Sequence, residues 1–128
     1  ALQSDFAEAY NSRGNAYADL KQYDKAITDY DKIIALQPNF ALAYSNRGLT
    51  YNDLKQYDKA IVDHNKAIAL QPDLAQAYQN RGVTYLDLKQ YDKAIRDFQK
   101  AYLLAQQQDD TTVAQAAKRG IELLQQQQ

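Results

Sequence analysis

An octapeptide, LKQYDKAI, occurs three times in the chain, at residues 20–27, 54–61 and 88–95. Each copy begins 34 residues after the previous one, and the similarity around it extends over residues 7–40, 41–74 and 75–108. A fixed period of this length is typical of repeat proteins, in which each unit buries its apolar face against its neighbours. The sequence therefore predicts a linear array of similar units.

Each copy contains two segments in which apolar and small residues have helical spacing. In the first copy, Tyr10, Gly14 and Tyr17 are three or four residues apart, and so are Ala26 and Tyr30. A short break separates the two segments, and its aspartate is placed to favour the start of the next helix. We expect first helices near residues 7–20, 41–54 and 75–88, and second helices near 24–36, 58–70 and 92–107.

The pattern resembles the tetratricopeptide repeat, which has an aromatic residue, a glycine and a tyrosine in its first helix, then an alanine and an aromatic residue in its second, then a proline. In the first copy these residues are Tyr10, Gly14, Tyr17, Ala26, Tyr30 and Pro38. In the later copies they are Tyr44, Gly48, Tyr51, Ala60, His64 and Pro72, then Tyr78, Gly82, Tyr85, Ala94 and Phe98. The resemblance implies an all-α fold, a right-handed superhelical α-solenoid of helix-turn-helix repeats with about seven helices.

The two ends of the chain differ from the repeats. Residues 1–6, ALQSDF, are similar to ALQPNF and ALQPDL at the later repeat boundaries, so we expect the tail of a preceding repeat, left by excision from a longer array or by decay of a copy. We expect residues 109–128 to form a capping helix that covers the end of the array, with Asp110, Thr111 or Thr112 as its N-cap. Its apolar stripe consists of Val113, Ala116, Ala117, Gly120, Ile121 and Leu124. The whole chain, 1–128, is then a single domain.

Three features recur in every copy and carry structural predictions. An arginine precedes each glycine, and an aspartate stands in the second helix, 16 residues after that arginine. We therefore expect ion pairs within each repeat, the alternative being a solvated arginine. The mid-helix glycines indicate close helix approach. A lysine stands at the turn, where the family commonly has glycine, and a left-handed backbone there would be strained. The residues are Arg13 with Asp29, Arg47 with Asp63 and Arg81 with Asp97; Gly14, Gly48 and Gly82; and Lys21, Lys55 and Lys89.

Composition excludes several classes of function. Fifteen Lys and Arg against 16 Asp and Glu give a net charge of −1, which favours neither nucleic acid nor an anionic membrane as a partner. The chain has no cysteine and one histidine, so a zinc-thiolate site is excluded. His64 stands where the other copies have an aromatic ring, and we interpret it as a core residue rather than as a metal ligand or general base. We expect no cofactor, no metal ion and no enzymatic activity.

The resemblance implies that the first helices line a concave groove, which receives an extended peptide or a partner helix. The groove residues then include amides, an apolar strip and three aspartates; the alternative is that they are solvated helix residues. They are Glu8, Asn11, Asn15, Ala18 and Asp19, then Leu42, Ser45, Asn46, Leu49, Asn52 and Asp53, then Gln76, Gln79, Asn80, Val83, Leu86 and Asp87.

Family members that bind chaperones hold a terminal carboxylate with two asparagines and three cationic residues. Asn15 and Asn46 occupy the asparagine positions here, but Asn11, Gln76 and Asn80 occupy the cationic ones. The sequence therefore predicts a protein-interaction module for a neutral or basic, partly apolar protein or peptide. We also expect a cytoplasmic location. The alternative is a structural, self-assembling segment that forms a homo-oligomer through its array ends.

Overall fold

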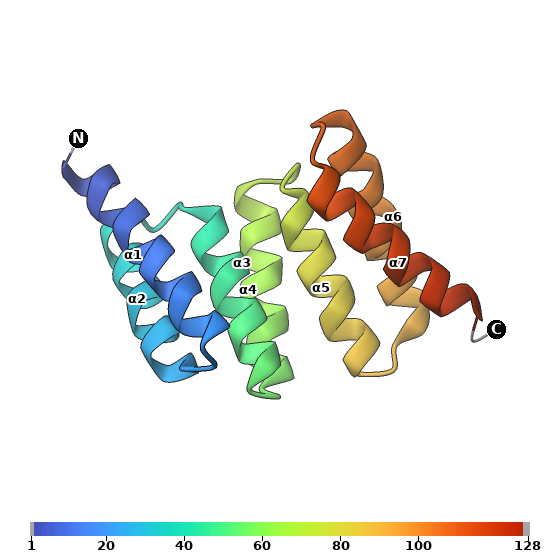
Figure 1. Ribbon diagram of the computed structural model, residues 1–128, viewed down its shortest axis with the longest axis horizontal. Coiled ribbons are helices and arrows are strands. Elements are labelled where there is room, and N and C mark those ends of the chain that lie inside the picture. Colours follow the sequence, from blue (N-terminus) through green and yellow to red (C-terminus); the bar gives the residue numbers. More distant parts are fainter. Residues whose placement is uncertain (1, 127–128) are drawn as a thin grey trace.

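The computed structural model describes residues 2–126, and this part of the chain forms seven α-helices, so the predicted all-α class is confirmed. They are α1 (Leu2–Asp19), α2 (Tyr23–Leu36), α3 (Ala41–Asp53), α4 (Tyr57–Leu70), α5 (Ala75–Asp87), α6 (Tyr91–Gln107) and α7 (Thr111–Gln126). The helix pairs α1–α2, α3–α4 and α5–α6 follow one another along one axis, with α7 at the C-terminal end (Figure 1). Residues 1, 127 and 128 of the expected ranges lie outside the described part.

The helix α1 begins earlier than the predicted boundary at residue 7. Residues 2–6, which we expect to be the tail of a preceding repeat, form the first turn of α1. At the later boundaries the chain leaves the helix at Gln37 and Gln71, each followed by a proline. Ser4 has the backbone amide that a proline lacks, so the helix continues through it.

Each first helix packs against the second helix of its own repeat, and α7 covers α5 and α6 at the end of the array. The predicted close approach is confirmed, because a Cβ atom added to Gly48 would lie 2.7 Å from the His64 ring. Gly14 and Gly82 face Tyr30 and Phe98 at 2.8 and 2.7 Å in the same way. The glycines therefore allow the aromatic rings of the second helices to reach the first helices.

His64 is a core residue, as predicted. Its side chain is 0% exposed, and its Nε2 atom lies 3.1 Å from the Thr84 hydroxyl of the next repeat. Burial, with a smaller effect from the charge of Arg81, lowers the pKa of His64 to about 3. The imidazole is therefore neutral at physiological pH.

The predicted ion pairs within each repeat are confirmed. The Arg47 guanidinium donates two hydrogen bonds of 2.8 Å to the Asp63 carboxylate, and the other two repeats contain the same bidentate pair. The Asp63 side chain is 5% exposed. Arg47 also donates to Asp31 of the preceding repeat at 2.9 Å, and it lies over the rings of Tyr44 and Tyr51. Arg47 thus connects the two helices of its own repeat and also contacts the preceding repeat.

The turn lysines have a left-handed backbone, with φ angles of 61°, 61° and 60° at Lys21, Lys55 and Lys89. In the first repeat, the amide of Gln22 donates to the Tyr17 carbonyl at 2.8 Å and the amide of Lys21 donates to the Ala18 carbonyl at 2.9 Å. These two bonds form a Schellman motif, which ends the first helix and turns the chain into the second.

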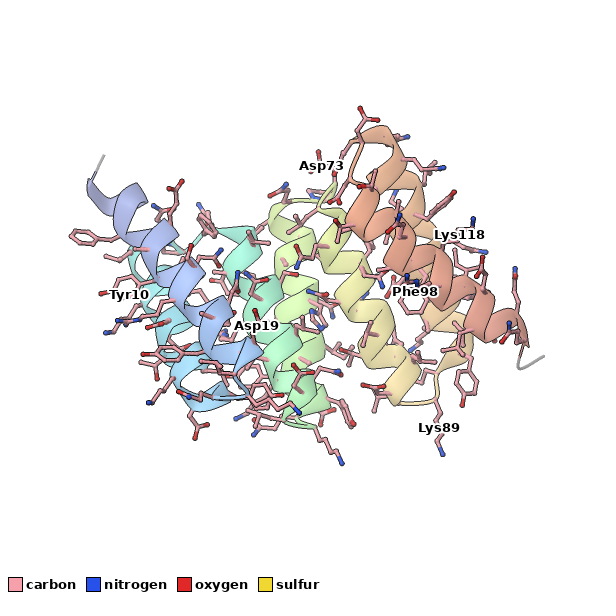
Figure 2. All side chains as sticks on the ribbon, in the orientation of Figure 1. Tyr10, Asp19, Asp73, Lys89, Phe98 and Lys118 are labelled. Atoms are coloured by element: carbon pink, nitrogen blue, oxygen red, sulfur yellow. The ribbon has the colours of Figure 1, made fainter. Side chains whose placement is uncertain are left out.

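The capping helix α7 begins after Asp110, whose carboxylate accepts a hydrogen bond of 3.1 Å from the Val113 amide. Asp110, and not Thr111 or Thr112, is therefore the N-cap. The predicted apolar stripe faces the array, with Val113, Ala117 and Leu124 buried. Phe98 lies between Gly82 of α5 and Gly120 of α7, each of which would place a Cβ 2.7 Å from its ring (Figure 2). None of the helices in the described residues is long and apolar enough to cross a membrane.

Candidate functional site

A hollow of about 320 Å³ lies where α1, α3 and α5 face the same side of the molecule. Most of its lining residues belong to the predicted groove set; Tyr30 of α2 and Thr50 of α3 do not. The lining residues are Asn15, Ala18, Asp19, Tyr30, Asn46, Leu49, Thr50, Asp53 and Gln76. The first helices of the array therefore share a concave surface.

Several of the predicted groove residues connect neighbouring first helices. The Asn46 amide donates to the Asn11 amide oxygen at 2.9 Å, and the Asn80 amide donates to the Ser45 hydroxyl at 2.9 Å. Ser45, Asn46 and Asn80 are 0%, 7% and 5% exposed. A ligand has little access to these three side chains, so their polar atoms serve mainly to fix successive repeats against each other.

The three aspartates of the groove are not equivalent. All three are exposed, but Asp87 accepts a hydrogen bond of 2.9 Å from the buried Asn52 amide of the preceding repeat. The residue equivalent to Asn52 one repeat earlier is Ala18, which has no side-chain donor to offer Asp53. Partial burial, and to a smaller extent the negative charge of Asp87, raises the pKa of Asp53. The carboxylates of Asp53 and Asp87 are therefore close enough to repel each other.

Asp19 occupies the last residue of α1, and Figure 2 shows it at the end of that helix on the side of α3. Asp53 occupies the last residue of α3 in the same way. The aligned peptide dipoles of a helix place partial negative charge at its C-terminus, which adds to that of the carboxylates. The end of the groove near residues 19 and 53 thus combines two carboxylates with two helix C-termini.

Apart from Glu8, which is exposed, the rest of the groove is apolar or carries amides. Leu42, Leu49, Val83 and Leu86 are partly buried, as are Gln76 and Gln79. Asn15 accepts a hydrogen bond of 2.5 Å from the Tyr30 hydroxyl, and burial raises the pKa of that hydroxyl to about 12. Asn15 is exposed and is held in place by this bond, so it can present its amide group to a ligand.

Helix pairs repeated along one axis, with a hollow lined by the first helix of each pair, define a helical repeat scaffold that presents an extended surface. The tetratricopeptide repeat family matches residues 7–40, 41–74 and 75–107, and the chain belongs to this family. No curated protein sequence is significantly similar to the chain.

The fold is shared with solved TPR domains. The Arabidopsis OM64 TPR domain is 28% identical over 98% of this chain and 99% of its own, with a TM-score of 0.84. The first TPR of Spaghetti (RPAP3), bound to the HSP90 peptide SRMEEVD, is 27% identical over 96% of this chain and 93% of its own, with a TM-score of 0.81. The second TPR domain of human RPAP3, in complex with the HSP70 peptide SGPTIEEVD, is 25% identical over 96% of this chain and 98% of its own, with a TM-score of 0.78. This chain is therefore a non-catalytic protein-binding module.

Proposed function

We propose that the concave groove binds an extended, neutral or basic, partly apolar segment of a partner protein. The observation that carries this proposal is the row of exposed aspartates, Asp19, Asp53 and Asp87, beside the apolar residues Leu49 and Val83. Carboxylates attract cationic side chains, and the apolar residues offer contact area for an uncharged part of the same segment. The amide of Asn15 can bond the backbone of an extended chain.

The proposed partner differs in charge from the peptides of the similar domains. SRMEEVD and SGPTIEEVD are acidic. In this chain, the positions that the resemblance makes cationic are Asn11, Gln76 and Asn80, and two of them bond to Asn46 and Ser45 of neighbouring helices. An acidic peptide would find no cation at those positions and would be repelled by the aspartates of the groove.

The experiment is a selection of peptides from a random phage-displayed library on the immobilised full chain. We expect the selected peptides to contain lysine or arginine next to apolar residues. They should bind at least tenfold more weakly to the double variant Asp19→Lys/Asp53→Lys, since charge reversal repels a cation. The matched control is Asp73→Lys/Glu122→Lys, which makes the same charge change at exposed residues outside the groove. Acidic selected peptides, or equal binding to both double variants, would contradict the proposal.

A second candidate function is self-association through the N-terminal end of the array. Phe6 on α1 is 54% exposed. The Arg13 side chain is also 54% exposed, against 20% and 22% for Arg47 and Arg81, which contact a preceding repeat. Sedimentation velocity over a range of concentrations tests this candidate. Self-association that is lost in Phe6→Ser, but kept in Leu123→Ser at the other end, would support it, and a monomer at every concentration would refute it.

A further inference from the structure

We propose that the hollow between the first and second repeats is a specificity pocket for one lysine or arginine side chain of the partner. This inference rests on the proposed function and adds the position and chemical class of the residue that is recognised. We call this hollow the Asp19–Asp53 pocket, after the two carboxylates that line it.

The Asp19–Asp53 pocket has the two parts that a long cationic side chain requires. Ala18, Leu49 and the ring of Tyr30 provide apolar surface for the aliphatic stem. Asp19 and Asp53 provide acceptors for the charged end, and both stand at helix C-termini, where the helix dipole favours positive charge. The volume of about 320 Å³ is at the lower end of the range for ligand sites and suits one side chain better than a larger ligand.

The neighbouring carboxylate, Asp87, differs from Asp53 in its hydrogen-bond partner. Asp87 already accepts a hydrogen bond from the Asn52 amide. The residue equivalent to Asn52 in the next repeat is Leu86. Asp53 has Ala18 at the position of Asn52, so a ligand can supply the donor that the protein supplies to Asp87. The cation is therefore recognised at the N-terminal half of the groove.

A metal ion fits the pocket less well than an organic cation. Calcium takes six to eight oxygen ligands, and magnesium requires octahedral geometry. Within residues 6–126, whose side chains the structure describes, no group of three or more histidine, aspartate or glutamate side chains is arranged to hold a metal ion. An ammonium or guanidinium group, in contrast, donates a few directed hydrogen bonds and needs only the two carboxylates and a neighbouring amide oxygen.

The test uses the full chain and small probes that represent the two side chains. n-Butylammonium and n-propylguanidinium are titrated by ¹H–¹⁵N NMR, with n-butanol and n-propylurea as neutral controls. We expect the cations to shift the amide signals of Asp19, Leu49 and Asp53 and to bind at least fivefold more tightly than the neutral probes. Addition of 0.5 M NaCl should weaken the cations only, because salt screens the carboxylates.

Three variants locate the interaction. Asp53→Asn should weaken cation binding at least fivefold, Asp87→Asn at most twofold, and Asp73→Asn, outside the groove, should leave it unchanged. Neutral probes that bind as tightly as the cations, or an Asp87→Asn effect equal to that of Asp53→Asn, would overturn the inference. If basic peptides from the phage selection bind the groove but the small cations do not, the inference of a cation pocket is wrong and the proposed function still holds. Cation binding without any peptide binding would overturn the proposed function instead.

Discussion

At the scale of single residues, the arginine–aspartate pairs hold the two helices of each repeat together. The Arg47 side chain is 20% exposed and that of Asp63 is 5% exposed, so loss of either partner leaves the other charge partly buried and unpaired. We expect Arg47→Leu to lower the free energy of unfolding by about 2 kcal/mol in the wild type and by less than half as much in an Asp63→Ala background. Urea denaturation of the four proteins measures both costs.

The control for this cycle is Arg96→Leu, because Arg96 is exposed on α6 and its substitution should change stability by no more than about 0.5 kcal/mol. Equal costs of Arg47→Leu in the two backgrounds would show that the side chains do not stabilise each other.

His64 makes stability depend on pH. Its folded-state pKa of about 3 lies below the value of about 6.5 for an unfolded chain. Stability is therefore complete above pH 6.5 and falls as the pH falls from 6.5 towards 3, because only the unfolded state then binds the proton. Between pH 7 and 5 the loss from this group is about 2 kcal/mol.

His64→Phe should remove that loss, since Phe98 occupies the equivalent place in the third repeat, and Thr84 keeps its hydrogen bond to the Asn80 carbonyl. Thermal or urea unfolding of both proteins at pH 7 and pH 5 provides the comparison. If the wild type and the variant lose the same stability over this range, the imidazole is not buried in its neutral form.

At the scale of helices and turns, the sequence places lysine where the backbone is left-handed. Lys55 has a φ of 61°, a conformation that costs about 1 kcal/mol for a residue with a Cβ atom and little for glycine. We expect Lys55→Gly to raise the urea midpoint, with a gain of about 1 kcal/mol. Lys66→Gly, inside α4, should lower stability by about the same amount, as glycine does in a helix. A lower midpoint for Lys55→Gly would show that the lysine side chain stabilises the turn.

The helices, the ion pairs and the strained turns could all be predicted because they recur with the repeat, and three copies distinguish a pattern from chance. The roles of Asn46, Asn52 and Asn80 could not be predicted in this way. Whether such an amide faces a ligand or the next helix depends on how closely successive first helices approach, and this distance is set by packing rather than by spacing in the sequence. The early start of α1 was missed for a different reason, since similarity to the later boundaries outweighed the absence of proline at Ser4.

At the scale of the whole molecule, neighbouring repeats stabilise one another. The helix α3 packs against α1, α2, α4 and α5, whereas α1 packs against α2 and α3 at the N-terminal end. In an array held together by nearest neighbours, the ends open more readily than the middle. We expect amide hydrogen exchange in α1 to be at least tenfold faster than in α3, with α5 and α6 protected by the cap α7. Uniform exchange along the chain would show that it unfolds as a single unit.

In the proposed function, the first helices bind a partner segment along their shared concave surface. The most direct measurement is a ¹H–¹⁵N chemical-shift map of the full chain with a peptide from the phage selection. We expect the largest shifts on groove residues of α1, α3 and α5, including Leu49, Asp53 and Val83. Shifts concentrated on the exposed faces of α2, α4 and α6, or at Phe6 and α7, would contradict it.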